Sequence, residues 1–182
     1  MHPRWFIILL LFLFFACKEE VLPKPRALLR LDYPAGSGDL LETDHFQFER
    51  NSLARIKKKD KMSLTLDYPN LKGSIFITYK KVENNLDRLL ADAQKLSYEH
   101  VVKADDIQDY LVVDNEDKVY GMIYEVSGDA ASQAQFYVTD STRHFLTGSL
   151  YFYARPNYDS IYPAAVYIQK DIRRIVETLK WN

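Results

Sequence analysis

The sequence predicts an α+β domain, built as a single, mostly antiparallel sheet with helices packed on it. Between residues 62 and 154, most segments alternate apolar and polar side chains with the period of two that is typical of strands. Two other segments, 84–102 and 160–179, instead repeat apolar residues every three or four positions, as amphipathic helices do. The expected order is therefore strands, helix, strands, helix.

The first strands are expected before the first helix. Residues 44–58 should be extended, with Phe46 and Phe48 on one face. Two alternating runs, 62–68 and 74–80, then flank a short turn that contains proline and glycine. These two runs predict an antiparallel hairpin.

The first helix is expected over residues 84–102, with Asn84 or Asn85 as its N-cap. His100 lies near its end, where a protonated imidazole interacts favourably with the helix dipole, and this role is a better explanation than metal binding. Its apolar stripe comprises Leu86, Leu89, Leu90, Ala93, Leu96 and Val101.

Two more hairpins are expected after this helix. One spans residues 107–127 around the acidic turn 114–117, whose spacing differs from that of a calcium-binding EF-hand loop. The other spans residues 133–154 around the turn 141–144. Its second strand, 145–154, has apolar side chains on both faces, which predicts a central position in the sheet.

A final helix is expected over residues 160–179, with Asp159 and Ser160 as candidate caps. Burial of its long apolar stripe should make docking of this helix essential to the fold. The stripe comprises Ile161, Ala164, Ala165, Ile168, Ile172, Ile175, Val176 and Leu179.

The N-terminus has the pattern of a bacterial lipoprotein signal. Arg4 precedes an apolar run, residues 5–16, which is shorter than the ~20 residues of a membrane-spanning helix. Ala16 then precedes Cys17, the only cysteine of the chain, as in a lipobox. The alternatives are a short membrane anchor and a plain secretory signal with an incidental cysteine.

The expected organisation is a signal peptide (1–16), a lipid-anchored tether (17–31) and one α+β domain (32–182). Lys18-Glu19-Glu20 resembles the surface-export signal of some Bacteroidota lipoproteins, although a solvated spacer explains it equally well. With Cys17 acylated, no thiol is left for a disulfide, a nucleophile or a sulfur-ligated metal.

Charge and composition exclude one class of partner. The net charge is −1, which offers no electrostatic basis for nucleic-acid binding. The one basic cluster, residues 55–61, is expected to be a solvated loop or strand edge, with contact to anionic headgroups as the alternative.

The sequence offers no positive support for an enzyme. Asp140, Ser141 and His144 have the residue types of a hydrolase triad, but no Gly-x-Ser-x-Gly surrounds the serine, and turn chemistry is the ordinary explanation for these residues. His45, His100 and His144 lack the His-x-x-x-His spacing of metal hydrolases. We therefore expect no catalytic residues, no metal and no cofactor. An unrecognised hydrolase is kept as the last of three functional hypotheses, after the two given below.

The chain resembles the gliding-motility lipoprotein GldD family of Bacteroidota in long ordered blocks. The longest block is FYVTDSTRHFLTGSLYF at 136–152. The chain departs from the family pattern at Ala27-Leu28 and at Thr147. The other matching blocks are 23–26, 30–34, 67–69, 84–86, 119–124, 156–161, 171–173 and 177–181.

The resemblance implies a non-enzymatic, lipid-anchored envelope protein linked to gliding motility and the type IX secretion apparatus. It implies no catalytic or cofactor residues. The expected role is structural or in assembly, with a membrane contact through the N-terminal lipid (palmitate), a location in the cell envelope facing the periplasm or the surface, and other envelope proteins as partners. The order of elements also resembles PsbP-like domains, by analogy of fold alone.

Besides the hydrolase hypothesis, two interpretations of the function are considered: binding of a partner protein and binding of a small ligand. In the first, exposed residues bind a partner protein, although turn and cap chemistry also accounts for them. In the alternative, the protein is a small-ligand binder or carrier, with Tyr and Phe side chains lining a groove between sheet and helix. The candidate contact residues come from 140–144 and 155–160: Asp140, Ser141, Thr142, His144, Asn157 and Asp159.

Overall fold

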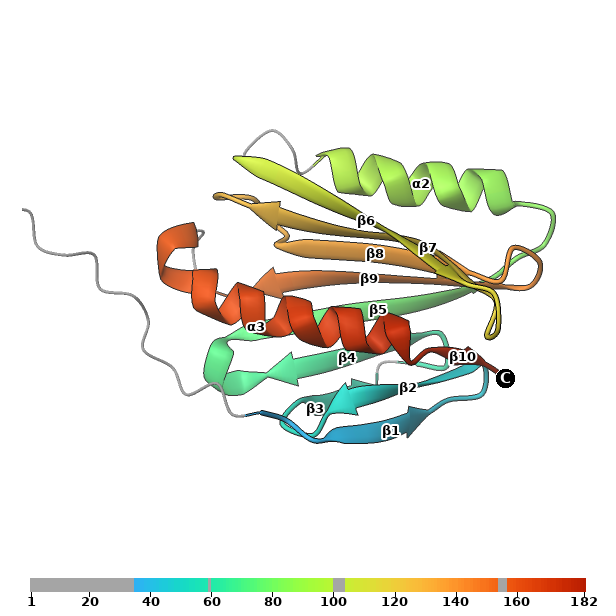
Figure 1. Ribbon diagram of the computed structural model, residues 1–182, viewed down its shortest axis with the longest axis horizontal. Helices are drawn as coiled ribbons and strands as arrows, with labels where there is room; N and C mark the ends of the chain where they lie inside the picture. Colours follow the sequence, from blue (N-terminus) through green and yellow to red (C-terminus); the bar gives the residue numbers. More distant parts are fainter. Residues whose placement is uncertain (1–34, 59, 100–103, 154–156) are drawn as a thin grey trace, which may run out of the picture.

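The part of the chain that the structure describes is mostly β, with two antiparallel sheets and two α-helices (Figure 1). A computed structural model of the protein describes residues 35–58, 60–99, 104–153 and 157–182. The expectation of one sheet is therefore wrong, although the mixture of antiparallel strands and packed helices agrees with the predicted class. The analogy to PsbP-like domains has no support in this architecture.

The larger sheet has seven strands in the order β3-β4-β5-β9-β8-β7-β6, and every neighbouring pair is antiparallel. The three predicted hairpins are confirmed as β4–β5, β6–β7 and β8–β9. The expected central strand is confirmed too, because β9 lies fourth of the seven. The strands are β3 (Arg55–Lys58), β4 (Ser63–Tyr68), β5 (Gly73–Lys81), β6 (Asp106–Asp114), β7 (Val119–Ser127), β8 (Ala134–Thr139) and β9 (His144–Phe152); a 3₁₀ turn, Pro69–Leu71, joins β4 to β5.

The smaller sheet, β1-β2-β10, comes from the two ends of the domain. It consists of β1 (Gly38–Glu42), β2 (Phe46–Asn51) and the two-residue β10 (Lys180–Trp181). The run expected to be one extended segment, 44–58, is broken between β2 and β3. It therefore contributes a strand to each sheet.

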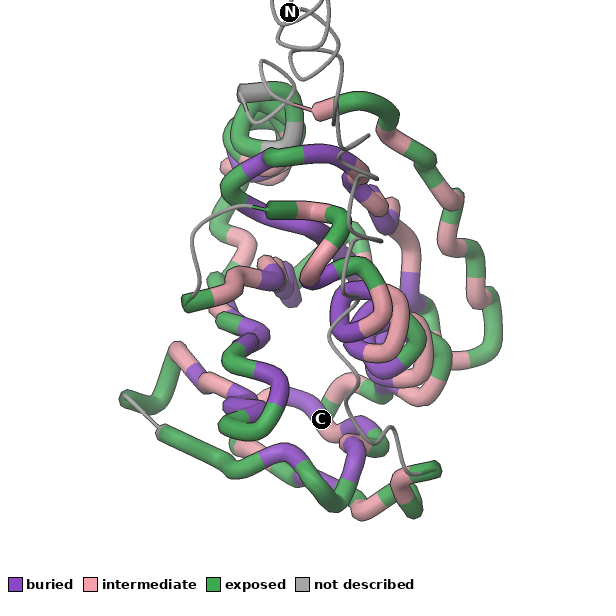
Figure 2. Tube along the Cα trace, turned by 90° about the vertical axis from the view of Figure 1, so that its left-hand side faces the viewer, coloured by how far each residue is buried: buried purple, intermediate pink, exposed green. Residues whose placement is uncertain are grey.

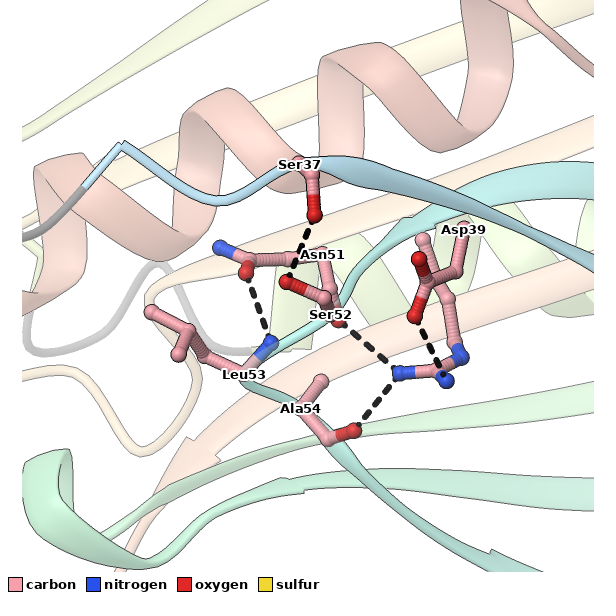
Figure 3. A network of polar contacts seen from close by, with 7 residues as sticks. Ser37, Asp39, Asn51, Ser52, Leu53 and Ala54 are labelled. Atoms are coloured by element: carbon pink, nitrogen blue, oxygen red, sulfur yellow. Dashed lines mark hydrogen bonds and ion pairs between the residues drawn. The ribbon is translucent and has the colours of Figure 1, made fainter.

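Polar contacts explain this break (Figure 3). The Asn51 side-chain oxygen accepts the backbone N–H of Leu53 at 3.0 Å. The Arg50 guanidinium donates to the carbonyl oxygens of Asn51 and Ala54 at 3.1 and 2.9 Å, and pairs with Asp39 of β1 at 3.1 Å. These bonds satisfy the backbone where the chain turns from one sheet to the other.

The two helices cover opposite faces of the larger sheet. Helix α3 (Tyr158–Glu177) packs on the face that Leu146 and Leu150 of β9 also line. Every residue of its predicted apolar stripe is buried. Helix α2 (Leu86–Glu99) packs on the other face, against Phe145 and the side chains of β7 and β8 beside it.

Helix α2 is less buried than the sequence predicts. Leu89 is buried, but Leu96 is 42% exposed. His100 and Val101 lie outside the described residues. Its apolar stripe therefore covers only part of the sheet.

The start of α3 also differs from expectation. Asn157 is the N-cap residue, rather than Asp159 or Ser160, and its side chain makes no capping bond. The Asp129 carboxylate, from the loop before β8, accepts the Tyr158 backbone N–H at 2.8 Å instead. A residue distant in sequence thus stabilises this helix end.

Gly148 allows the core to close between β8 and β9. It pairs with Phe136, and a Cβ at this position would lie 2.1 Å from the Phe136 ring. The bare glycine therefore lets the aromatic ring cover the strand.

Candidate functional site

The turn between β8 and β9 is built around the Asp140 carboxylate. One of its oxygens accepts the backbone N–H groups of Thr142, Arg143 and His144 at 3.0, 2.7 and 2.8 Å, and the other accepts the Thr142 hydroxyl at 2.8 Å. Partial burial raises the pKa of Asp140, but these hydrogen bonds together lower it to about 2. Ser141 has φ +65°, a left-handed conformation that the turn requires.

His144 is buried, with 7% of its surface exposed, so its expected place on an exposed contact surface is wrong. The Tyr79 hydroxyl shares a 2.8 Å hydrogen bond with its Nδ1, and its ring stacks on Trp181 with centroids 5.2 Å apart. Burial lowers the pKa of His144, which favours the neutral imidazole. The ring of His45 stacks on Tyr79, the residue that hydrogen-bonds to His144, with ring centroids 4.3 Å apart.

Asn157 and Asp159 are exposed at the beginning of α3, as expected of contact residues. They lie at the opposite end of β9 from the turn that holds Asp140 (Figure 1). A nine-residue strand spans about 30 Å, so the structure does not bring the two groups into one surface. Residues 155 and 156 lie outside the described residues.

The described residues do not assemble the hydrolase triad. The Asp140 carboxylate is occupied by its own turn, and His144 bonds to Tyr79 rather than to a serine. Within the described ranges, no three His, Cys, Asp or Glu side chains are grouped so that they could hold a metal ion.

A second polar centre, which the sequence did not indicate, surrounds Asp171. Its buried carboxylate accepts the Asn51 amide at 2.8 Å and the Tyr68 hydroxyl at 2.9 Å. Asn51 also donates to the Tyr167 hydroxyl at 2.8 Å. Burial raises the pKa of Asp171, while the bonds from Asn51 and Tyr68 oppose that change. Because it joins α3 to a strand of each sheet, this centre has a structural role.

A groove runs between α3 and the outer strands β6 and β7. It consists of two hollows, of about 460 and 340 Å³, which share Tyr110 and Arg173 in their linings. Arg173 crosses the groove: its Nε pairs with Glu125 at 2.7 Å, and its guanidinium carbon lies 4.4 Å from the centroid of the Tyr110 ring.

The interior beneath the groove is filled. Ile168 and Ile172 of α3 are fully buried, as are Ile75 and Leu150 of the sheet below them. Two smaller hollows, of about 110 and 190 Å³, lie elsewhere. The expected ligand groove is thus limited to the edge of the sheet, where charged side chains contribute to its lining.

Within the described part of the chain, no helix has the length and apolar character to cross a membrane. The fold and its surfaces define the class: a two-sheet, mostly β domain with a filled core and a groove beside an outer strand. The chain belongs to the gliding motility lipoprotein GldD family, whose model matches residues 18–181. None of the curated proteins compared matches the chain.

Membership of this family makes the chain a gliding motility-associated lipoprotein. It places the protein among the lipid-anchored proteins of the cell envelope. The resemblance inferred from the sequence is therefore confirmed at the level of the family.

Proposed function

We propose that this lipoprotein is a non-enzymatic structural or assembly component of the gliding motility and type IX secretion machinery. The family match over residues 18–181 carries the proposal, because it covers all but the N-terminal segment and the last residue. In this role the domain binds other envelope proteins while its lipid holds it at a membrane.

The N-terminal sequence supports the anchoring part of the proposal. Cleavage before Cys17 leaves a cysteine at the start of the mature chain, and the family match begins at the next residue. Acylation of Cys17, with palmitate among the chains, supplies the anchor, and residues 17–31 supply a tether that contains Pro23 and Pro25. Several acyl chains are needed for stable anchoring, because one chain binds a bilayer only marginally.

The tether bears on where the domain lies relative to the membrane. A proline-containing segment favours extended conformations, so the domain reaches away from the membrane. We place it facing the periplasm, with exposure at the cell surface as the alternative that protease treatment of whole cells distinguishes.

The first experiment compares a deletion strain with strains that express the wild type or Cys17→Ala. The deletion should abolish colony spreading and secretion of type IX cargo. Cys17→Ala should remove the protein from the washed membrane fraction and reduce both activities, whereas the control Leu28→Ala, in the same tether, should behave as the wild type. Normal spreading and normal secretion in the deletion strain would refute the proposal.

A further inference from the structure

The strongest unexplained surface is the outer edge of β6. This strand ends the seven-stranded sheet and pairs, among the described residues, with β7 alone. Its pairing runs without a bulge from Asp106 opposite Ser127 to Asp114 opposite Val119. The strand lies on the outside of the molecule, and all its residues are exposed or intermediate in burial (Figure 2).

The edge of β6 has only part of the usual protection against pairing with another chain, namely the negative charge of its three aspartates. Natural edge strands are also kept short, carry lysine or proline, or contain bulges. The opposite edge, β3, fits this rule, with four residues that include Arg55 and Lys57. β6 has nine residues without lysine, arginine or proline, and exposes 74% of Leu111 and 57% of Val113.

Charge selects the partner for this edge. Residues 104–117 contain six acidic residues and no basic one. Two cations reach this region from the C-terminal part of the chain, and each is paired: Arg173 with Glu125 and Lys180 with Asp117. Asp106 and Asp109 are exposed, so the edge attracts a cationic strand.

The same charges disfavour pairing of β6 with a second copy of itself. Full antiparallel overlap of two copies centres on Tyr110 and places Asp106 of one copy opposite Asp114 of the other at both ends. Like charges directly opposite each other destabilise a strand pair. The aspartates thus exclude self-association while they admit a basic segment.

We propose that β6 binds an extended segment of a partner protein, rich in lysine or arginine and in β-branched residues, as an eighth antiparallel strand. Main-chain hydrogen bonds supply affinity, and the alternating side chains supply specificity. On one face, apolar partner residues cover Leu111 and Val113. On the other face, basic residues face Asp106 and Asp114 beside the groove that Tyr110 and Arg173 share.

This inference deepens the proposed function, because it names the chemistry of the partner and the surface that binds it. The probe is a nine-residue peptide, KVTVTKTVK, whose lysines face the three aspartates of β6 when it pairs antiparallel over the whole strand. Its acidic twin, EVTVTETVE, has the same apolar residues. The protein is the full chain purified from membranes in mild detergent.

The binding experiment measures affinity by fluorescence anisotropy and locates the peptide by amide hydrogen exchange. The basic peptide should bind at least about tenfold more tightly than its acidic twin and should protect the amides of β6. Asp106→Lys combined with Asp109→Lys should weaken binding at least about tenfold. The matched control, Glu42→Lys with Asp44→Lys, makes the same change of charge at exposed positions of the smaller sheet, away from the edge, and should leave binding unchanged.

A second pair of variants tests the apolar part of the edge. Leu111→Lys should weaken binding, while Leu40→Lys, at a 64% exposed leucine on the edge strand β1, should not. Melting temperatures verify that each variant is folded. Absence of binding, equal binding to the acidic twin, equal affinities of edge and control variants, or protection of β3 or β1 instead of β6 would overturn the inference.

The two proposals fail separately. A deletion strain with normal motility and secretion removes the proposed function but leaves a basic-strand site on β6 intact. Peptide binding that ignores the edge variants removes the site but leaves the motility role intact.

Discussion

At the scale of single residues, Asp140 shows how one carboxylate organises a turn. Three backbone N–H groups and one hydroxyl converge on it, so its charge is stabilised in the folded state. The order of Asp and Ser at the start of the turn was visible in the sequence, and the turn interpretation of these residues agrees with their contacts.

Asp140→Asn should lower the free energy of unfolding at neutral pH. It should also make this free energy depend less on pH in the acidic range. The folded pKa of Asp140, about 2, is below the ordinary value of 3.8. Its contribution is therefore present above pH 4 and is lost as the pH falls toward 2. Urea unfolding should give the variant a free energy of unfolding about 1 kcal/mol below that of the wild type at pH 7, a value reduced for solvent screening. This difference should become small as the pH falls to 2.

The control for this prediction is Asp44→Asn, at an exposed position in the turn between β1 and β2. Its gap from the wild type should be small at every pH. A gap for Asp140→Asn that stays constant from pH 7 to pH 2 would contradict the assignment of the low pKa.

His144→Ala should destabilise the fold by about 2–3 kcal/mol, because it removes a buried ring and leaves the Tyr79 hydroxyl without its partner. His45→Ala removes a ring that stacks on the same tyrosine from a less buried position, and should cost less than about 1 kcal/mol. Thermal unfolding compares the two variants. Equal melting temperatures for wild type and His144→Ala would show that this cluster contributes little to stability.

At the scale of elements, α3 is the part of the chain that its sequence describes best. The spacing of its apolar residues corresponds to a stripe that is buried throughout. Helix α2 agrees less well, since Leu96 of its expected stripe is 42% exposed. The difference arises because α3 packs against strands of both sheets, whereas α2 covers one face of a single sheet.

Ile172→Ala should cost about 2–5 kcal/mol, the range for a large residue removed from a packed core. Lys170→Ala, on the exposed face of the same helix, should change stability by no more than about 0.5 kcal/mol. Chemical denaturation followed by circular dichroism measures both. Similar losses for the two variants would mean that the buried stripe does not carry the docking of α3.

At the scale of the whole molecule, Asp171 joins the parts that come from distant segments. From α3 it accepts hydrogen bonds from Asn51 of β2 and Tyr68 of β4, which belong to different sheets. The two sheets and the helix should therefore unfold together in one cooperative transition.

Asp171→Ala should destabilise the protein by about 2–4 kcal/mol, since Asn51 and Tyr68 then lose their acceptor in the interior. Asp171→Asn keeps an acceptor oxygen and should cost less. Burial raises the pKa of Asp171, so ionisation of the wild type weakens the fold as the pH rises through that pKa. The stability of Asp171→Asn relative to the wild type should therefore improve from acid to neutral pH, as measured by urea unfolding.

The candidate site was less predictable than the fold. The sequence indicated exposed contacts near residues 140–144 and 155–160, but these lie at opposite ends of β9, and His144 is buried. Nothing in the local pattern distinguished β6 from the other strands of the sheet. The only unusual feature of its sequence is that it has three aspartates and no lysine. This composition indicates a binding edge only once the strand is known to lie at the end of the sheet.

Local chemistry by itself determined the hairpins, the amphipathic helix α3, the central place of β9, the lipobox-like Cys17 and the resemblance to the GldD family. Each of these depends on residues that are close in sequence, and side-chain periodicity or an ordered motif records them. Only the tertiary structure decided that the run 44–58 divides between two sheets, that Asp171 is buried, and that β6 is the last strand of the larger sheet among the described residues. Those features depend on which distant segments meet, because pairing and burial are set by contacts between residues far apart in the chain.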